Sequence, residues 1–249
     1  MFRKLATAAA LSAALLMPLA ACGSSTAKAA WTEPKSAASP SQRPAELLST
    51  AVAETRAVNV SYRLGDDTEG MSGVYDVSKK TGTVEGDVNG EKMHLVVTAN
   101  DMYMSGLKAL SGRTLHLVVA KLPGEHGLIV FTDPVLGLAM LDGAVTVASP
   151  GPGVFQGTID LTKVTAATPG GKKMVEVVTR AAGAKANAVE FNAKVDAQGY
   201  VTEFIAKLPG ANKGTDMLYK ISFSNFGAPV TVAVPKTKII EAPAASYRA

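Results

Sequence analysis

The stretch NAVEFNAKVDAQGYVTEFIAKLPGANKGTDMLYKISFSNF (residues 187–226) consists largely of runs in which apolar and polar residues alternate. The first run, 187–196, is the clearest, and its polar positions alternate with Val189, Phe191, Ala193 and Val195. Alternation of this kind is typical of a strand with one buried face and one solvated face. Gln198-Gly199 supplies a turn after this run, so the following residues are predicted to return as an antiparallel neighbour.

The same alternation extends in both directions from this stretch. Returning strands are predicted over 200–208 and over 216–226, where one face carries Met217, Tyr219, Ile221 and Phe223. Earlier strands are predicted at 58–64, 71–77, 83–88, 91–98, 114–122 and 155–161. The connections are rich in turn residues, and Asn89-Gly90 is the strongest hairpin signal among them. Because short connections join antiparallel neighbours, we expect one long meander.

Three segments depart from the alternation and are predicted as helices. Residues 44–57 begin with a proline and carry apolar residues at helical spacing. Residues 172–182 carry an apolar stripe that requires a partner surface, and residues 134–141 are apolar on nearly every side. The last pattern predicts a buried helix, for which Asp133 is the expected N-cap. The sequence therefore predicts an α+β domain with a few helices on one face of an antiparallel sheet.

The N-terminus has the features of an export signal. Arg3 and Lys4 precede an apolar run over 5–16 that is too short for a membrane span, which predicts a signal peptide over residues 1–21. The quartet Leu-Ala-Ala-Cys ending at Cys22 resembles a lipobox, in which the cysteine receives diacylglycerol and becomes the first mature residue. Cys22 is the only cysteine in the chain, which excludes a disulfide scaffold. The alternative is an ordinary signal peptide beside an unrelated cysteine.

Composition divides the rest of the chain. The segment after Cys22, GSSTAKAAWTEPKSAASPSQRP, is rich in Ser, Ala and Pro and cannot bury enough apolar surface to fold. We expect an acylated cysteine and flexible linker over 22–43, then a folded domain with a short C-terminal tail over 44–249. Arg3 and Lys4 belong to the signal peptide, which leaves 23 of the 25 basic residues against 21 acidic ones. This near balance argues against a nucleic-acid partner.

A search for catalytic residues gives no candidates. The chain has no G-x-S-x-G, H-E-x-x-H or phosphate-binding motif. His94, His116 and His126 are expected to be exposed strand or loop residues, without partners at metal-ligand spacing. Asp87, Asn89 and Gly90 resemble part of a calcium loop, but a hairpin turn explains them better. We therefore expect no enzyme activity, no metal and no cofactor.

A curved sheet covered by apolar helices is able to enclose a ligand cavity. Methionines are frequent in the domain, and flexible thioethers suit surfaces that adapt to apolar ligands, although they also fill gaps in ordinary cores. Alternation predicts which sheet residues point inward and line such a cavity: Leu115, Leu117, Phe191, Phe204, Met217, Tyr219 and Ile221. The covering helix at 134–141 is expected to contribute Leu136 and Met140.

Several stretches resemble the actinobacterial LppX/LprG-type lipoproteins, which are relatives of the LolA and LolB lipoprotein carriers. These are the lipobox LAAC, GVYDVSKKTGTVEG (73–86), NDMYM (100–104), FQGTIDLTKV (155–164), FNAKVDAQGYVTEF (191–204) and YKISFSNFGAPVTVAVP (219–235). They are strand and turn features and include no catalytic signature. The resemblance implies a LolA-like half-barrel of antiparallel strands wrapped over helices, with a cavity for lipid acyl chains.

Together these patterns predict a lipoprotein anchored through Cys22 to the outer face of the bacterial cell membrane. Its expected partner is a lipid or other amphiphilic small molecule, held in an apolar cavity and carried between membrane and wall. A second interpretation is a non-catalytic interaction or scaffold module of the envelope with a filled core. A third is an accessory of cell-wall enzymes. An internal apolar void open to solvent distinguishes the first interpretation from the second.

Overall fold

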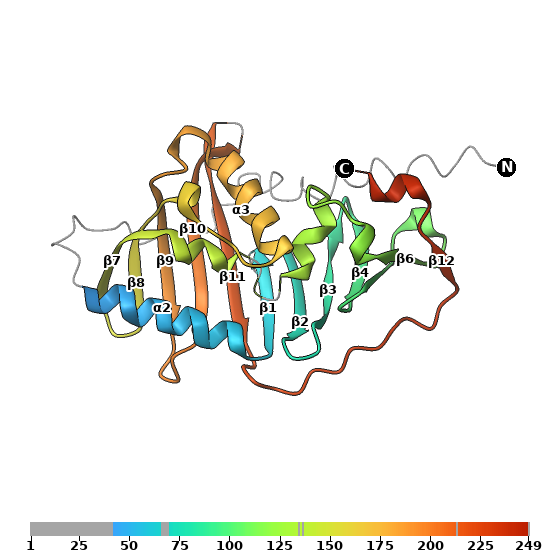
Figure 1. The fold of residues 1–249 in the computed structure, drawn as a ribbon, viewed down its shortest axis with the longest axis horizontal. Helices are drawn as coiled ribbons and strands as arrows, with labels where there is room; N and C mark the ends of the chain where they lie inside the picture. Colours follow the sequence, from blue (N-terminus) through green and yellow to red (C-terminus); the bar gives the residue numbers. More distant parts are fainter. Residues whose placement is uncertain (1–41, 66–69, 134, 136, 213, 249) are drawn as a thin grey trace.

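One twelve-stranded sheet is the framework of the computed structural model, which describes residues 42–65, 70–133, 135, 137–212 and 214–248. The strands are β1 (Val60–Gly65), β2 (Gly70–Asp76), β3 (Thr81–Val88), β4 (Glu91–Val97), β5 (Asp101–Ser105), β6 (Thr114–Val118), β7 (Ala144–Gly151), β8 (Val154–Ile159), β9 (Val189–Val195), β10 (Val201–Asn212), β11 (Thr215–Ser224) and β12 (Ile239–Glu241). Their spatial order is β12-β6-β5-β4-β3-β2-β1-β11-β10-β9-β8-β7 (Figure 1).

The sheet contains two meanders, β1–β6 and β7–β11, rather than the single long meander that short connections predicted. The chain leaves the sheet after β6 and returns at β7 on the far edge. β11 then pairs antiparallel with β1 and joins the two meanders, while β12 adds to β6 in parallel. The alternation in a single sequence indicates which face of the sheet each side chain takes. It does not indicate which strands, far apart in the sequence, become neighbours.

Each of the nine predicted strands is present, with ends shifted by a few residues, and three further strands were missed. The predicted strand at 114–122 ends at Val118 and continues as the 3₁₀ helix η4 (Val119–Lys121). β5 is short and follows turn residues, β7 ends in Ser-Pro-Gly, and β12 has only three residues. The predicted hairpin at Asn89-Gly90 is confirmed, with both residues at positive φ.

Two predicted helices are confirmed as α2 (Gln42–Ala57) and α3 (Pro169–Ala182), and α3 begins three residues earlier than predicted. Thr168 is its N-cap, accepting a hydrogen bond from the Gly171 amide at 2.9 Å. A Cβ at Gly170 would lie 2.7 Å from the Ile129 carbonyl oxygen, so glycine permits the close approach. The sequence Pro-Gly-Gly thus starts this helix instead of preventing it.

The predicted helix over 134–141 is wrong. The 3₁₀ helix η5 (Gly127–Thr132) ends before this region, and a second 3₁₀ helix, η6 (Leu138–Gly143), begins inside it. Gly137, at φ 86°, is in the left-handed region immediately before η6, which interrupts any continuous α-helix there. Asp133 ends η5, and its Oδ1 accepts from the Val135 amide at 2.9 Å, so it caps a turn rather than an α-helix. The remaining 3₁₀ helices are η3 (Lys108–Leu110), η7 (Leu161–Lys163), η8 (Gly183–Lys185) and η9 (Ala244–Tyr247).

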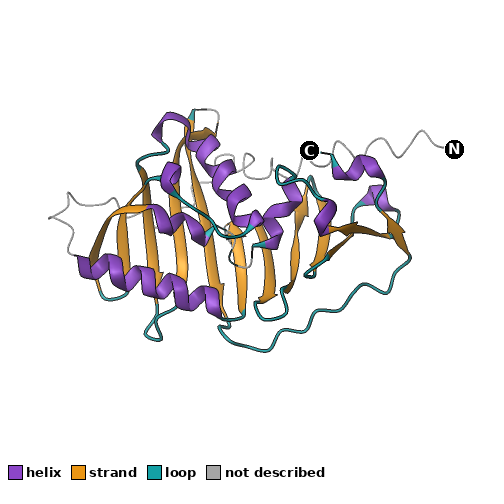
Figure 2. Ribbon diagram, viewed as in Figure 1, coloured by secondary structure: helices purple, strands orange, loops and turns teal. Residues whose placement is uncertain are grey.

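The helices lie on one face of the curved sheet, which gives the expected α+β half-barrel (Figure 2). α2 packs on β7 and β10, and α3 packs on β10 and η5. The buried Thr55 hydroxyl fixes α2 in place, since it donates to the Ala51 carbonyl and accepts from the Val201 amide of β10 at 2.8 Å. Arg56 also forms a two-point ion pair with Asp142 of η6, at 3.0 and 3.1 Å.

Candidate functional site: the covered face of the sheet

The covered face consists of cross-strand rows in which large and small side chains alternate. One row runs through Gly157, Phe191, Ala206 and Tyr219, and the next through Phe155, Ala193, Phe204, Ile221, Leu64, Met71, Gly86 and Met93. A third runs through Phe223, Tyr62, Gly73, Val84, Leu95, Met104 and Leu115. A glycine or alanine on an adjacent strand lies beside each of five inward rings, those of Tyr62, Phe155, Phe191, Phe204 and Tyr219. This is how a strongly curved sheet accommodates bulky inward side chains.

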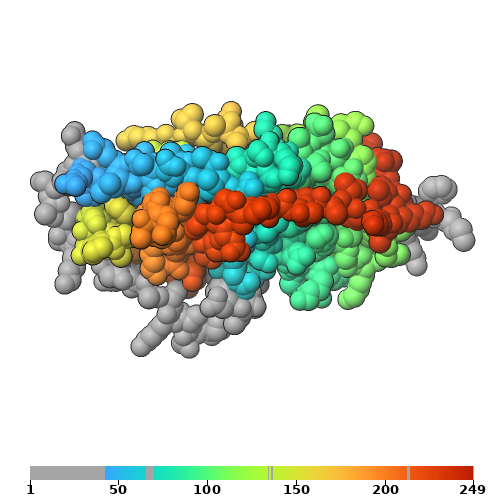
Figure 3. Space-filling view, turned by 90° about the horizontal axis from the view of Figure 1, so that it is seen from below, coloured from blue at the N-terminus to red at the C-terminus, as the bar shows by residue number. Residues whose placement is uncertain are grey.

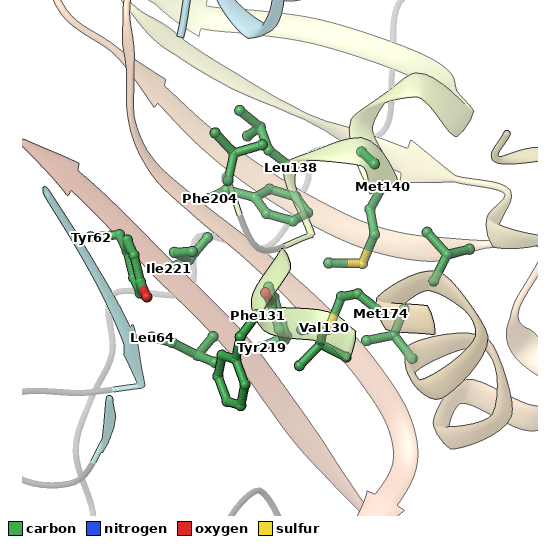
Figure 4. Packing of buried hydrophobic residues seen from close by; sticks show 14 of the residues in the cluster. Tyr62, Leu64, Val130, Phe131, Leu138, Met140, Met174, Phe204, Tyr219 and Ile221 are labelled. Atoms are coloured by element: carbon green, nitrogen blue, oxygen red, sulfur yellow. The ribbon is translucent and has the colours of Figure 1, made fainter. Parts of the chain in front are cut away.

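Side chains from three covering elements meet these rows. Val130 and Phe131 of η5, Leu138 and Met140 of η6 and Met174 of α3 gather over Phe204, Tyr219 and Ile221 (Figure 4). All of these residues are buried, and the Phe204 and Tyr219 rings contact each other at 6.2 Å between centroids. A Cβ at Gly137 would lie 2.7 Å from the Tyr219 hydroxyl oxygen. This part of the face is tightly packed.

The predicted ligand-lining residues fall into two separate groups. Phe191, Phe204, Tyr219 and Ile221 lie together on β9–β11, with Met140 of η6 in the same buried cluster. Met217 extends their face on β11 and is half-buried. Leu115 and Leu117 are buried on β6, eight strands from β9, which is about 38 Å at the usual strand spacing. Leu136 lies outside the described residues, as do Cys22, the signal peptide and the linker before residue 42.

The two groups lie in different halves of the sheet. We call β7–β11, on which α2 and α3 pack, the helix-covered half. We call β2–β6 the methionine half, because Met71, Met93, Met102 and Met104 stand on its covered face. Neither α2 nor α3 makes a comparable contact with the methionine half. Its rows also contain the glycines of β2 and β3: Gly73, Gly82 and Gly86.

A few polar groups are enclosed where the halves meet the helices. Asp133 is only 5% exposed, and burial raises the pKa of its carboxyl group. Its Oδ2 accepts a hydrogen bond from the Thr168 hydroxyl at 3.0 Å, which connects η5 to the cap of α3. Burial, with the nearby Asp133 charge, raises the pKa of Tyr75 to about 12 and also raises that of Tyr219. Both phenols therefore stay neutral at physiological pH.

The expectation that His126 is exposed is wrong. It is 1% exposed, its Nδ1 accepts from the Leu128 amide at 3.2 Å, and its Nε2 donates to the Ser246 carbonyl at 3.1 Å. Burial lowers the pKa of this imidazole. The ring therefore caps η5 and fastens the C-terminal segment to it. Its partner lies 120 residues away in the sequence, so no local pattern could reveal this role.

His116 on the open face of β6 also has partners that the sequence did not reveal. Its Nε2 lies 2.8 Å from Asp101 Oδ1 of β5, and its Nδ1 lies 2.9 Å from the Glu241 carboxylate of β12. Tyr103 stacks on the ring at 4.9 Å. The hydrogen bond to Asp101, reinforced by Glu241, raises the pKa of this imidazole despite partial burial. This arrangement holds the edge strand β12 electrostatically.

Within the ranges given above, no three or more His, Cys, Asp and Glu side chains are arranged to hold a metal ion. The helices in the same ranges are too short or too polar for any of them to span a bilayer.

Comparison with known proteins gives a likeness of fold. No protein-family model matches the chain, and no curated protein sequence matches it. Among solved structures, the chain is similar to LprF from Mycobacterium bovis, with a TM-score of 0.52 and 16% sequence identity. The match covers 80% of this chain and 99% of LprF. At this identity the likeness concerns the fold alone, and the fold is the LolA-like α+β half-barrel that the sequence resemblance implied.

Proposed function

We propose that this chain is an exported lipoprotein, anchored through lipid on Cys22 to the outer face of the bacterial cell membrane. Its covered face binds a lipid or other amphiphile and carries it between membrane and wall. The lipobox-like quartet ending at Cys22 and the resemblance to LppX/LprG-type lipoproteins support the anchor. The fold shared with LprF supports a place in the same structural group.

The observation that carries the binding proposal is the composition of the methionine half. Its inward surface combines unbranched thioethers with glycines, and no α-helix presses on it as α2 and α3 press on the other half. Met side chains change rotamer at low energetic cost, and one of them, Met71, fills the space above Gly86, where a Cβ would lie 2.5 Å from its Cγ. An acyl chain therefore has its most adaptable surface beside Leu115 and Leu117. The helix-covered group of Phe191, Phe204, Met217, Tyr219, Ile221, Leu136 and Met140 is proposed as the continuation of this surface.

The test uses protein that is purified from a bacterial membrane, with no lipid added during purification. Native mass spectrometry followed by lipid extraction is expected to show one bound amphiphile in addition to the covalent lipid. Met102→Trp, which places a rigid ring between Val97 and Leu117, is expected to remove that ligand and leave the fold intact. The matched control is Tyr103→Trp, at the adjacent, half-buried position on the open face of β5. Wild-type protein that carries no ligand and binds no fluorescent fatty acid would contradict the proposal.

A second function is favoured by the packing of the helix-covered half. There the rings interlock with glycine and alanine, and Gly157 and Gly137 have no room for a Cβ. The glycines of the methionine half are closed as well, since a Cβ at Gly73, Gly82 or Gly86 would lie 2.6 Å or less from a neighbouring atom. If that half has no space for a ligand, the protein is a non-catalytic interaction or scaffold module of the envelope. In that case Met102→Trp would lower the free energy of unfolding by about 1–3 kcal/mol, as overpacking does, and there would be no ligand to lose.

A further inference from the structure

The segment that connects β11 to β12 lies along the lower rim of the molecule (Figure 1). We call residues 226–238 the strap. At its start the Gly227 amide donates to the Asn59 carbonyl at 2.8 Å, and the Asn59 side-chain amide donates to the Ala228 carbonyl at 3.2 Å. At its end the Thr114 amide donates to the Lys238 carbonyl at 3.0 Å, beside the parallel pairing of β12 with β6. The strap is therefore fastened at both ends.

Between these two attachments the strap lies open to solvent. Residues 229–236 form no hydrogen bond to any other described residue. Val230 and Val232 are half-buried on alternate positions, whereas Val234 is 44% exposed, and Ile239 just beyond the strap is 42% exposed. Seen from below, the strap crosses the surface beyond the end of α2 (Figure 3). One side of this extended segment thus faces outward with unpaired peptide groups and apolar side chains.

The same segment carries positive charge that no carboxylate neutralises. The strap contains Lys236 and Lys238 and no Asp or Glu, and both lysines are exposed. Arg113 is the residue before Thr114, which bonds to the strap. None of these three has an acidic partner among the described residues. The lysines on the open face of the sheet differ, since Lys194 and Lys220 both pair with Glu203, at 2.8 and 3.4 Å.

We propose that the strap is a docking surface for an anionic lipid bilayer. Lysines interspersed with exposed aliphatic side chains are the combination that binds at membrane interfaces, the charges to phosphate headgroups and the apolar groups below them. A soluble polyanion would engage the lysines but would leave Val234 and Ile239 in water. The apolar component therefore favours a membrane over an anionic polymer.

Position on the molecule supports this partner, and this step rests on the proposed lipid anchor at Cys22. The 20 residues from Cys22 to Gln42 span at most about 70 Å when fully extended. α2 follows along the same lower rim and ends at Ala57, two residues before Asn59, which holds the strap (Figure 1). The tethered end and the strap thus lie on one rim, and both reach the same bilayer.

The test uses the chain from residue 22 with Cys22→Ser, which keeps every described residue and removes the lipid. Ala233→Cys in this chain provides a single site for an environment-sensitive fluorophore. We expect sedimentation with vesicles of phosphatidylcholine and phosphatidylglycerol at low ionic strength, a blue shift of the dye, and neither with phosphatidylcholine alone. Replacing Lys236 and Lys238 together by glutamate is expected to weaken binding by 30-fold or more. Loss of two charges near 1 kcal/mol each corresponds to about 30-fold, and reversal of their sign adds to it.

Matched variants separate docking from general charge. Lys172→Glu with Lys185→Glu makes the same change of charge on α3 and η8 and is expected to alter binding by less than about twofold. The neutral pair Lys236→Ser and Lys238→Ser is expected to give an intermediate loss, which guards against a folding defect in the glutamate variant. Val234→Ser with Ile239→Ser is expected to remove the blue shift.

Equal losses in the strap and control variants would overturn the proposal, as would undiminished vesicle binding by the glutamate variant. Binding to dextran sulfate without binding to vesicles would replace the membrane by an anionic polymer, which also overturns it. The test involves neither covalent lipid nor a bound ligand. Its failure therefore leaves the proposed function standing, and that function fails separately if native mass spectrometry finds no ligand.

Discussion

The helix-covered half and the methionine half are continuous parts of one sheet, yet their inward surfaces are built differently. In the first, Phe191, Phe204 and Tyr219 interlock with alanine and glycine under α2, α3, η5 and η6. In the second, four methionines face inward, the Tyr75 ring lies over Gly82, and no α-helix makes a comparable contact. Strand alternation is the same in both halves. Alternation therefore determines which face of the sheet is covered, whereas side-chain shape determines whether that face is rigid or adaptable.

The largest expected effect is the removal of a ring from the helix-covered half. Phe204 is fully buried beside Ala193 and Ile221, so Phe204→Ala is expected to lower the free energy of unfolding by about 3–5 kcal/mol. The methionine half provides the contrast, because Met102→Leu conserves volume and is expected to cost less than about 1.5 kcal/mol. Urea unfolding followed by circular dichroism measures both. Equal costs for the two variants would remove the distinction between the halves.

A second prediction concerns variants that enlarge a buried side chain of the helix-covered half instead of truncating one. Ala206 lies between Phe191 and Tyr219 on neighbouring strands, and it is fully buried. Because those rings already occupy the space, Ala206→Trp is expected to cost about 1–3 kcal/mol or more by overpacking. Ala193→Trp, between Phe155 and Phe204, is expected to behave alike. If both variants unfold at the wild-type temperature but lose binding of a fluorescent lipid, the cavity extends into the helix-covered half.

The strands of this fold were largely predictable, and their neighbours were not. Alternation located β9, β10 and β11 and the inward positions of Phe191, Phe204 and Tyr219, because burial on one face requires an apolar residue at every second position. It placed Leu115 and Leu117 in the same predicted cavity, although β6 lies eight strands from β9. Strand order depends on contacts between residues far apart in the sequence, and a local pattern contains no information about them.

The covering segments were harder to predict because their local signals conflict. An apolar run over 134–141 suggested a helix, but Gly137 at positive φ separates two 3₁₀ helices there. The helix predicted over 172–182 did not include Pro169-Gly170-Gly171, but tight packing against Ile129 and Asp133 makes these residues the first turn of α3. In both places the tertiary contact decides between conformations of similar local energy. His126 and His116 were misjudged because their partners lie elsewhere in the sequence: Ser246 for His126, and Asp101 and Glu241 for His116.

A third prediction concerns the outer edge of the methionine half, where His116 lies between Asp101 and Glu241 and stacks on Tyr103. The pKa of His116 is raised in the folded protein, chiefly by the hydrogen bond to Asp101. Its contribution to stability is therefore complete below its unfolded pKa of about 6.5 and is lost as pH rises through the folded value. We expect the free energy of unfolding to fall by on the order of 1 kcal/mol over this interval.

The measurement is urea unfolding at a series of pH values from about 5.5 upward. His116→Gln is expected to flatten the pH dependence, because glutamine retains a hydrogen-bonding group but does not titrate. The matched control is His94→Gln on β4, which lies on the same open face of the sheet. This variant is expected to keep the pH dependence of the wild-type protein. A wild-type stability that rises with pH in this range would contradict the assignment. If the free energy of unfolding still falls with rising pH in both variants, the effect belongs to another group.

The smallest expected effect concerns the N-terminal side of the helix-covered half. The acylated cysteine and linker are predicted over 22–43, and α2 begins at Gln42, so residues 23–41 are the part of the linker that precedes the helix. The first buried residue of α2 is Leu48, followed by Ala51 and Val52. Deleting 23–41 is therefore expected to change the melting temperature of the unlipidated chain by less than about 2 °C. In a domain of this size, such a change corresponds to a loss of less than about 1 kcal/mol from the free energy of unfolding. Extending the deletion through Leu48 removes a buried side chain and is expected to lower it by several degrees. A fall of more than about 5 °C for the shorter deletion would mean that the linker packs on the domain, and the helix-covered half would then have a third covering layer besides α2 and α3.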